Sequence, residues 1–123
     1  MPDRERVEAL VAMVEAGKFV EAIEAFYHPE ASMQENQGPP RVGRDGLAAR
    51  ERKVMAGFKT MVTRPVEALL VDGDMSVIRW VFEFTPHEGP TMVLDELALQ
   101  RWRGDRIIEE RFYYDPAQTR PGG

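Results

Sequence analysis

The sequence predicts an α+β domain, in which helices come first and a meandering antiparallel sheet follows. Up to about residue 60, apolar side chains recur at the three- and four-residue spacing of amphipathic helices. From Met61 onward they alternate with polar residues, and turn sequences separate the runs. A chain of 123 residues, 43% hydrophobic and 30% charged, fits one domain with a single core.

Three helices are expected in the first half of the chain. The first has Asp3 as its cap, Gly17 as its stop and an apolar stripe of Val7, Leu10, Val11 and Val14. The second covers Phe19 to Phe26 and should stop at His28-Pro29, because the residue before a proline is pushed out of helical geometry. The third should begin near Asp45, with a stripe made by Leu47, Glu51, Val54, Met55 and Phe58.

The strands are expected between clear turn signals. A short strand at residues 31–35 should come before a proline-rich loop at 37–40. Four further strands are predicted at 66–71, 75–85, 91–102 and 106–115, and Asp72-Gly73-Asp74 is the strongest hairpin signal among their turns. We therefore predict one domain over residues 1–115, followed by a flexible Pro/Gly-rich tail at 116–123.

Strand alternation predicts which side of the sheet is buried. Successive side chains point to opposite faces, so Ile78, Trp80, Phe82 and Phe84 share one face of their strand. This aromatic side should face the helices. The next two strands have no decisive difference between their faces, so periodicity alone does not orient them.

Composition excludes several classes of function. A net charge of −5 without a Lys/Arg run argues against nucleic acid as a partner. Absence of cysteine removes disulfides and thiolate catalysis, and no apolar run reaches the ~20 residues that span a bilayer. Without the apolar core of a signal peptide, the simplest expectation is a cytoplasmic protein with no membrane partner.

Neither a metal site nor a cofactor site is predicted. His28 and His87 lack metal-ligand spacing to a second histidine, and Asp72-Gly73-Asp74 lacks the other ligands of a calcium loop. Glycine-rich phosphate loops and nucleophile elbows are also missing. We expect chemistry, if any, to use side chains alone.

The run FYHPEA at residues 26–31, the strand that ends at Glu35 and the following Arg41-Val42-Gly43-Arg44-Asp45 carry a family resemblance. Their order resembles the nuclear transport factor 2-like superfamily, in particular its SnoaL-like members (polyketide cyclases) and the ketosteroid isomerases. This resemblance covers roughly residues 5 to 115. It implies a cone-shaped barrel of strongly curved antiparallel or mixed sheet packed against three N-terminal helices, with one apolar pocket for a small apolar or aromatic molecule.

The resemblance also implies roles for particular residues. Glu35 stands where ketosteroid isomerases carry their carboxylate general base. The two groups that hydrogen-bond the enolate in those isomerases are replaced by Leu10 and Ala98, which argues against steroid isomerase activity. Phe112 stands where the limonene epoxide hydrolases carry a catalytic aspartate, which argues against that chemistry too.

The same register implies a set of pocket residues. Glu35 and Glu110 are the expected catalytic residues, with Glu35 as base and Glu110 as a second acid/base or a ligand-orienting group. The expected ligand-binding residues are Trp80, Phe82, Phe84, Glu96, Gln100, Phe112, Tyr114, Met55 and Phe58.

Each of these residues also has a structural interpretation. Glu35 and Glu96 could be solvated carboxylates at the rim, and Glu110 could make a structural hydrogen bond to Gln100 or Tyr114. Three functions therefore stay open. They are cofactor-independent proton transfer of the isomerase or cyclase type, a non-catalytic small-molecule-binding dimer, and a structural dimer whose cavity is filled by Trp80, Phe112 and Tyr114.

The sheet face opposite the aromatic side predicts association. It should carry apolar side chains interspersed with charges of both signs, which can pair across a two-fold axis. We expect a homodimer through this outer face, as is usual in the resembling family. The residues of the face are Val77, Arg79, Val81, Glu83, Leu97, Leu99, Arg101, Glu109, Arg111 and Tyr113.

Overall fold

The computed structural model describes residues 2–119 and has the α+β order that the sequence predicts. Its helices are α1 (Arg4–Glu15), α2 (Phe19–Phe26), α3 (Arg44–Ala56) and the short 3-10 helix η1 (Pro116–Thr119). Its strands are β1 (Tyr27–Glu35), β2 (Arg41–Val42), β3 (Phe58–Thr63), β4 (Leu69–Asp72), β5 (Met75–Pro86), β6 (Met92–Arg103) and β7 (Arg106–Tyr113).

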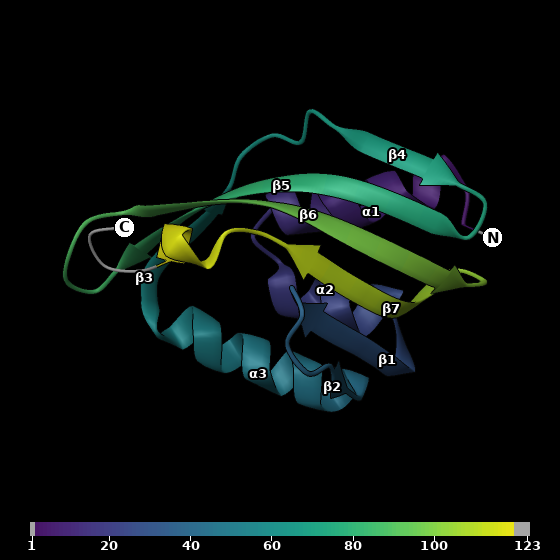
Figure 1. Ribbon diagram of the computed structural model, residues 1–123, viewed down its shortest axis with the longest axis horizontal. Helices are drawn as coiled ribbons and strands as arrows, with labels where there is room; N and C mark the ends of the chain where they lie inside the picture. The colour runs from purple at the N-terminus through teal and green to yellow at the C-terminus, as the bar shows by residue number, and fades with distance from the viewer. Residues whose placement is uncertain (1, 120–123) are drawn as a thin grey trace.

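The seven strands form one mixed sheet that is strongly curved. The strand order is β2-β1-β7-β6-β5-β3, and β4 also pairs with β5. Only β1 and β7 are parallel; the other pairs are antiparallel. Figure 1 shows β5, β6 and β7 bending across the molecule, with α1 and α2 behind them and α3 along the lower side. This cone-shaped arrangement of three helices and a curled sheet confirms the predicted fold.

Helix α1 forms as its sequence predicts. The Asp3 side chain accepts a hydrogen bond from the backbone N–H of Arg6 at 2.8 Å, which satisfies one of the free donors of the first turn. The predicted apolar stripe is buried, and Gly17 follows the helix with a φ of +80°, a conformation that favours glycine.

Strand β1 begins four residues earlier than predicted. Helix α2 ends at Phe26, and His28-Pro29 lies inside the strand rather than at its boundary. The pairing of β1 with β7 explains this. Tyr27 is opposite Ile107 and the next pair is Ser32 with Glu109, so the residues between Tyr27 and Ser32 bulge out of the ladder. A proline is tolerated there because no ladder hydrogen bond is lost.

Helix α3 and the strands after it also differ in detail from the prediction. Gly43, not Asp45, is the N-terminal cap of α3, and the helix ends at Ala56. Phe58 therefore belongs to β3, a strand that the sequence analysis did not separate, and β4 is shorter than predicted. The turn at Asp72-Gly73-Asp74 does join β4 to β5 as a tight hairpin.

The aromatic side of β5 faces the helices, as predicted. Ile78, Trp80 and Phe82 are buried, whereas Arg79 between them is exposed. The ladders with β6 and β7 continue this face through Ala98. A bulge in the β6–β7 ladder between Arg101 and Trp102 shifts the alternation of β7, so Ile107, which is 0% exposed, is buried as well as Glu110.

The segment after β7 begins with a short 3-10 helix. Pro116–Thr119 form η1, and the Gln118 side chain accepts a hydrogen bond from the backbone N–H of Asp95 and donates one to its carbonyl. The flexibility expected of the tail stays a prediction, and 120–123 lie outside the described residues. Within residues 2–119, none of the helices has the length and apolar character to cross a membrane.

Candidate functional site

A cavity of about 380 Å³ lies between the concave face of the sheet and the helices. Most of its wall is apolar, and residues from all three helices and from β1, β3, β5, β6 and β7 contribute to it. Four of the residues that line it are exposed to solvent and mark its mouth: Glu35, Arg41, Arg50 and Thr119. The cavity is thus open between the end of β1, α3 and η1.

One wall of the cavity is a column of aromatic rings on β5. Trp80, Phe82 and Phe84 occupy alternate positions, so their side chains point to the same side of the strand. The rings stack with centroids 5.7 Å apart for Trp80–Phe82 and 5.6 Å for Phe82–Phe84. Phe58 of β3 extends the column, 5.2 Å from Phe84. Such a wall suits a flat apolar or aromatic molecule.

A chain of buried hydrogen bonds ends at Glu110. Trp102 Nε1 donates to Ser76 Oγ at 2.8 Å, and Ser76 Oγ donates to Gln100 Oε1 at 2.6 Å. Gln100 Nε2 then donates to Glu110 Oε2 at 2.6 Å, while the Tyr27 hydroxyl donates to Glu110 Oε1. Since every donor in this chain points toward it, Glu110 is the terminal acceptor of a fully satisfied network.

Burial and hydrogen bonding act in opposite directions on the pKa of Glu110. The side chain is only 3% exposed, and this loss of water raises the pKa. Hydrogen bonds from Gln100 and Tyr27 stabilise the carboxylate and lower it. Burial prevails, and the pKa rises from 4.5 to about 7. Glu110 can therefore hold or release a proton near neutral pH.

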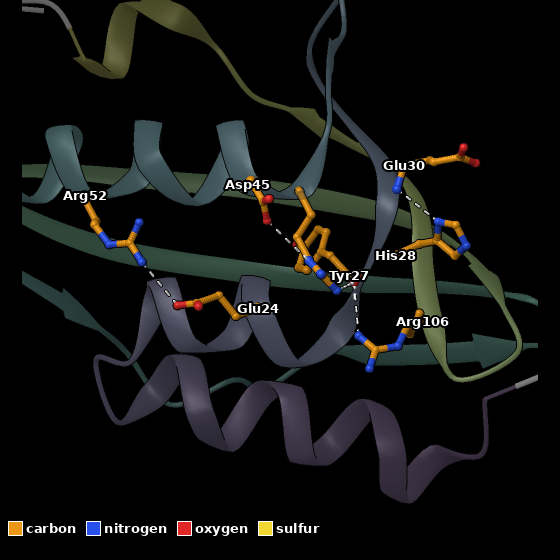
Figure 2. Close-up of polar contacts among 8 residues, drawn as sticks. Glu24, Tyr27, His28, Glu30, Asp45, Arg52 and Arg106 are labelled. Carbon is orange, nitrogen blue, oxygen red and sulfur yellow. Dashed lines mark hydrogen bonds and ion pairs between the residues drawn. The ribbon is translucent and has the colours of Figure 1, made fainter.

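Tyr27 is held in place from outside the cavity. Its backbone carbonyl accepts hydrogen bonds from Arg44 of α3 at 3.4 Å and from Arg106 of β7 at 3.3 Å. Figure 2 shows Arg106 reaching this carbonyl. Arg44 also pairs with the adjacent Asp45 at 3.9 Å. With its backbone held by two cations and its ring buried, Tyr27 presents its hydroxyl to Glu110. Burial, and then the charge of Glu110, raise the pKa of this hydroxyl well above 10.

Glu96 faces the cavity without a partner. It is 7% exposed, and none of the described residues makes a hydrogen bond or ion pair with its carboxyl group. Every fully enclosed polar side-chain atom among the described residues has a hydrogen-bond partner. Because the Glu96 carboxyl has none, it is not fully enclosed and must reach the open space of the cavity that Glu96 lines. Burial raises its pKa to about 8, and the charges of Glu110, Glu35 and Glu51 add to the rise. At neutral pH the group is a carboxylic acid that can donate a hydrogen bond.

Glu35 lies at the mouth, where β1 ends. Its side chain is 45% exposed; one oxygen is 3.5 Å from Arg41 Nη1, and the other accepts from the Tyr114 hydroxyl at 3.2 Å. The ion pair requires the carboxylate form, which is the form that a base needs. Burial and the charge of Glu35 raise the pKa of Tyr114. Glu35 ends β1, Tyr114 directly follows β7 and Glu96 lies on β6, and these three strands are neighbours in the sheet.

All but one of the site residues expected from the sequence line this cavity. Met55 is the exception: it packs against the core, and Val54 of the preceding position lines the cavity instead. A ligand contact by Met55 stays a prediction that the cavity lining does not support. Glu96 is buried rather than solvated at the rim. The residues of the expected set that line the cavity are Glu35, Glu110, Trp80, Phe82, Phe84, Glu96, Gln100, Phe112, Tyr114 and Phe58.

The sequence analysis did not identify Tyr27, Glu51, Arg41 and Arg50 as site residues. Tyr27 belongs to the motif that carried the family resemblance, and Glu51 to the stripe of the third helix, so signals for both were available. Burial raises the pKa of Glu51, and Arg50 opposes this rise. Within residues 2–119, His, Cys, Asp and Glu side chains form no group of three or more that could hold a metal ion.

Comparison with known proteins identifies the family. The family model of the SnoaL-like domain matches residues 7–110. The chain belongs to this SnoaL-like family. A search of curated proteins finds no match.

Solved structures show the same fold. A candidate SnoaL-like polyketide cyclase from Mesorhizobium loti is 25% identical, with a TM-score of 0.77 over 93% of this chain and 100% of that one. An NTF2-like protein of unknown function from Burkholderia pseudomallei is 16% identical, with a TM-score of 0.79 over 93% and 91%. TerC, co-crystallized with polyporic acid, is 19% identical, with a TM-score of 0.76 over 92% and 91%. The last two likenesses concern the fold alone.

Proposed function

We propose that this SnoaL-like protein binds a small apolar or aromatic molecule in the cavity and transfers a proton on it without a cofactor, as an isomerase or cyclase does. The observation that carries this proposal is the state of Glu96. A buried, unpartnered carboxylic acid faces an apolar cavity, while a carboxylate, Glu35, stands at the mouth. Two carboxyl groups in such different environments are suited to separate acid and base roles.

In this proposal Glu35 takes a proton from a carbon next to a carbonyl group of the ligand. Negative charge then develops on the carbonyl oxygen, and the neutral Glu96 donates a hydrogen bond to it. Glu35 returns the proton to another carbon, so no proton is gained or lost. Glu96 lies two positions from Ala98 on the same face of β6 and supplies the donor that Ala98 lacks. Glu110, already bound by Tyr27 and Gln100, orients the ligand or serves as a second acid.

The features of the cavity support a small ligand. A volume of about 380 Å³ falls in the ~300–1,000 Å³ range that is typical of small-molecule sites. It also argues against the interpretation in which Trp80, Phe112 and Tyr114 fill the space. TerC, crystallized with polyporic acid, supports a small organic molecule as the kind of ligand that this fold accepts.

A non-catalytic binding protein is the second candidate, and one observation favours it. Glu35 is half exposed and paired with Arg41, so water and a cation both stabilise its charge. A carboxylate that already has Arg41 and Tyr114 as partners is occupied by groups other than a ligand. The two candidates differ in whether the bound molecule exchanges hydrogen.

The test begins with molecules that co-purify with the protein. They would be extracted, identified by mass spectrometry and added back to the protein in deuterated water. We expect NMR to show deuterium entering at the carbon next to the carbonyl faster than in buffer alone. A molecule that binds but does not exchange above the buffer rate would contradict proton transfer and favour the binding protein.

We also propose a homodimer through the outer face of the sheet. Leu97 and Tyr113 are 46% and 37% exposed on this face, an unusual position for large apolar side chains. Next to Leu97 lie charges of both signs, such as the Arg79–Asp95 pair at 2.7 Å, which can be matched by a second copy across a two-fold axis. Light scattering at micromolar concentration is expected to give about twice the chain mass of 14.0 kDa. A mass of one chain would contradict the proposal.

A further inference from the structure

Carboxyl groups line the interior of the cavity, and the two cations in its lining, Arg41 and Arg50, lie at its mouth. Its lining includes four carboxyl groups, those of Glu35, Glu51, Glu96 and Glu110. A second, open groove lies on the outer side of α3 and β2, and its charged residues are all cations: Arg41, Arg50 and Lys53. Among the residues that the structure describes, no Asp or Glu lines this groove. Such a patch is notable in a chain whose net charge is −5.

The groove and the cavity are continuous. Arg41, Leu47, Arg50 and Val54 line both, so the β2 loop and one side of α3 form their common wall. Arg50 and Lys53 are three positions apart on α3 and therefore neighbours on its surface. A molecule that leaves the cavity over this wall passes Arg41 and Arg50 first and Lys53 next.

We propose that the cavity ligand carries an anionic group that lies in the groove against Arg41, Arg50 and Lys53, while its apolar body occupies the cavity. The ligand class is thus an apolar or aromatic molecule with a carboxylate, sulfate or phosphate at one end. This inference rests on the proposed function and specifies its substrate class.

Electrostatics inside the cavity fixes the orientation of this ligand. An anionic end placed in the interior would lose its water among mostly apolar walls and would face the buried Glu110, whose carboxyl is charged when it releases its proton near neutral pH. A neutral end with a hydrogen-bond acceptor, by contrast, meets the acid proton of Glu96. The anionic end is therefore excluded from the interior, and the cationic groove is its nearest favourable place.

The groove also suits such a group chemically. A guanidinium group offers planar donors that match carboxylate and phosphate oxygens, and a lysine adds a mobile point charge. Val42, 71% exposed in the same groove, offers apolar contact to a linker between the two ends of the ligand. Arg41 is only partly committed elsewhere, because its ion pair with Glu35 is 3.5 Å long and 44% of its side chain is exposed.

The test uses two fluorescent dyes that share one skeleton. Anilinonaphthalene sulfonate carries an anionic group, and N-phenylnaphthylamine is the same aromatic body without it. Dissociation constants for both would be measured by fluorescence with the wild-type protein and with the double variant Arg50→Gln/Lys53→Gln. We expect the variant to weaken binding of the sulfonate dye about 3- to 10-fold, the effect of losing two exposed charge contacts, and to leave binding of the neutral dye unchanged. Added salt should weaken the sulfonate dye more in the wild type than in the variant.

Arg52→Gln is the matched control. Arg52 lies on the same helix but outside both the groove and the cavity, and it pairs with Glu24 of α2 at 3.4 Å, as Figure 2 shows. This variant should leave both dyes unchanged, and melting temperatures would check that all variants fold. If the double variant affects both dyes equally, or neither, the anionic end is refuted while a small-molecule cavity stands. If the neutral dye does not bind the wild type at all, the proposed function itself fails.

Discussion

The free energy of unfolding of the wild-type protein is expected to decrease as the pH rises from about 4.5 to about 8, and Glu96→Gln is expected to remove most of this decrease. The unfolded chain releases the Glu96 proton near the ordinary pKa of 4.5, whereas the folded protein keeps it until about 8. Between these values the unfolded state binds fewer protons, so the free energy of unfolding decreases with rising pH. The stabilisation from the neutral acid is complete below pH 4.5 and lost above pH 8. At ~1.4 kcal/mol per pKa unit, the loss is about 3–5 kcal/mol.

Urea unfolding at pH 5 and pH 9 measures this effect. Glutamine keeps the size of Glu96 but has no charge to acquire, so the variant should be more stable than the wild type at pH 9 and similar to it at pH 5. Some pH dependence should remain, because the pKa of Glu110 is also raised, to about 7. Glu109→Gln is the control, since its side chain is 65% exposed on the opposite face of the sheet. Equal pH profiles for the wild type and Glu96→Gln would show that Glu96 is hydrated rather than enclosed.

Much of the fold could be predicted because local signals and burial agree along β5. The alternation of aromatic and polar residues along β5 is compatible with only one buried face. The turn Asp72-Gly73-Asp74 determines where β5 begins. The start of β1 could not be predicted in the same way. His28-Pro29 is a helix-stop signal, yet the parallel pairing of Tyr27 with Ile107 and the bulge after it determine the boundary. That pairing joins residues 80 positions apart, so no local sequence pattern indicates it.

The candidate site shows the same division. The family resemblance and strand alternation were enough to predict that Glu35, Glu96 and Glu110 belong to one site. They did not predict that Glu96 lacks a partner or that Tyr27 provides one for Glu110. Both facts depend on which side chains meet across the curved sheet. Met55 does not line the cavity because adjacent positions on α3 point in different directions, and the apolar stripe did not distinguish Val54 from Met55.

Glu35→Gln is expected to lower turnover, or hydrogen exchange at the bound ligand, by ~10²–10⁴-fold, the usual contribution of a general base. Glutamine keeps the size of Glu35 and an oxygen that can accept from the Tyr114 hydroxyl, but it cannot take a proton. Binding of the ligand should change little, because Glu35 is half exposed at the mouth and the aromatic wall of β5 makes most of the apolar contact. Kinetics and binding on the same preparation would separate the two effects.

Glu110→Gln is the comparison that assigns the base. Its carboxyl accepts from both Tyr27 and Gln100. The N–H₂ of a glutamine in its place would either face the N–H₂ of Gln100 or make the Tyr27 hydroxyl accept, which leaves the hydroxyl proton without its partner. Glu110→Gln should therefore lose stability, and its folded fraction should keep more turnover than Glu35→Gln, because Glu110 orients the ligand or acts as a second acid and is not the base. Glu35→Gln should lose turnover at unchanged stability. A folded Glu110→Gln protein without turnover, beside a Glu35→Gln protein with normal turnover, would move the base to β7. Normal exchange in both folded variants would leave neither carboxylate as the base, and the cavity would then be a binding site without chemistry of its own.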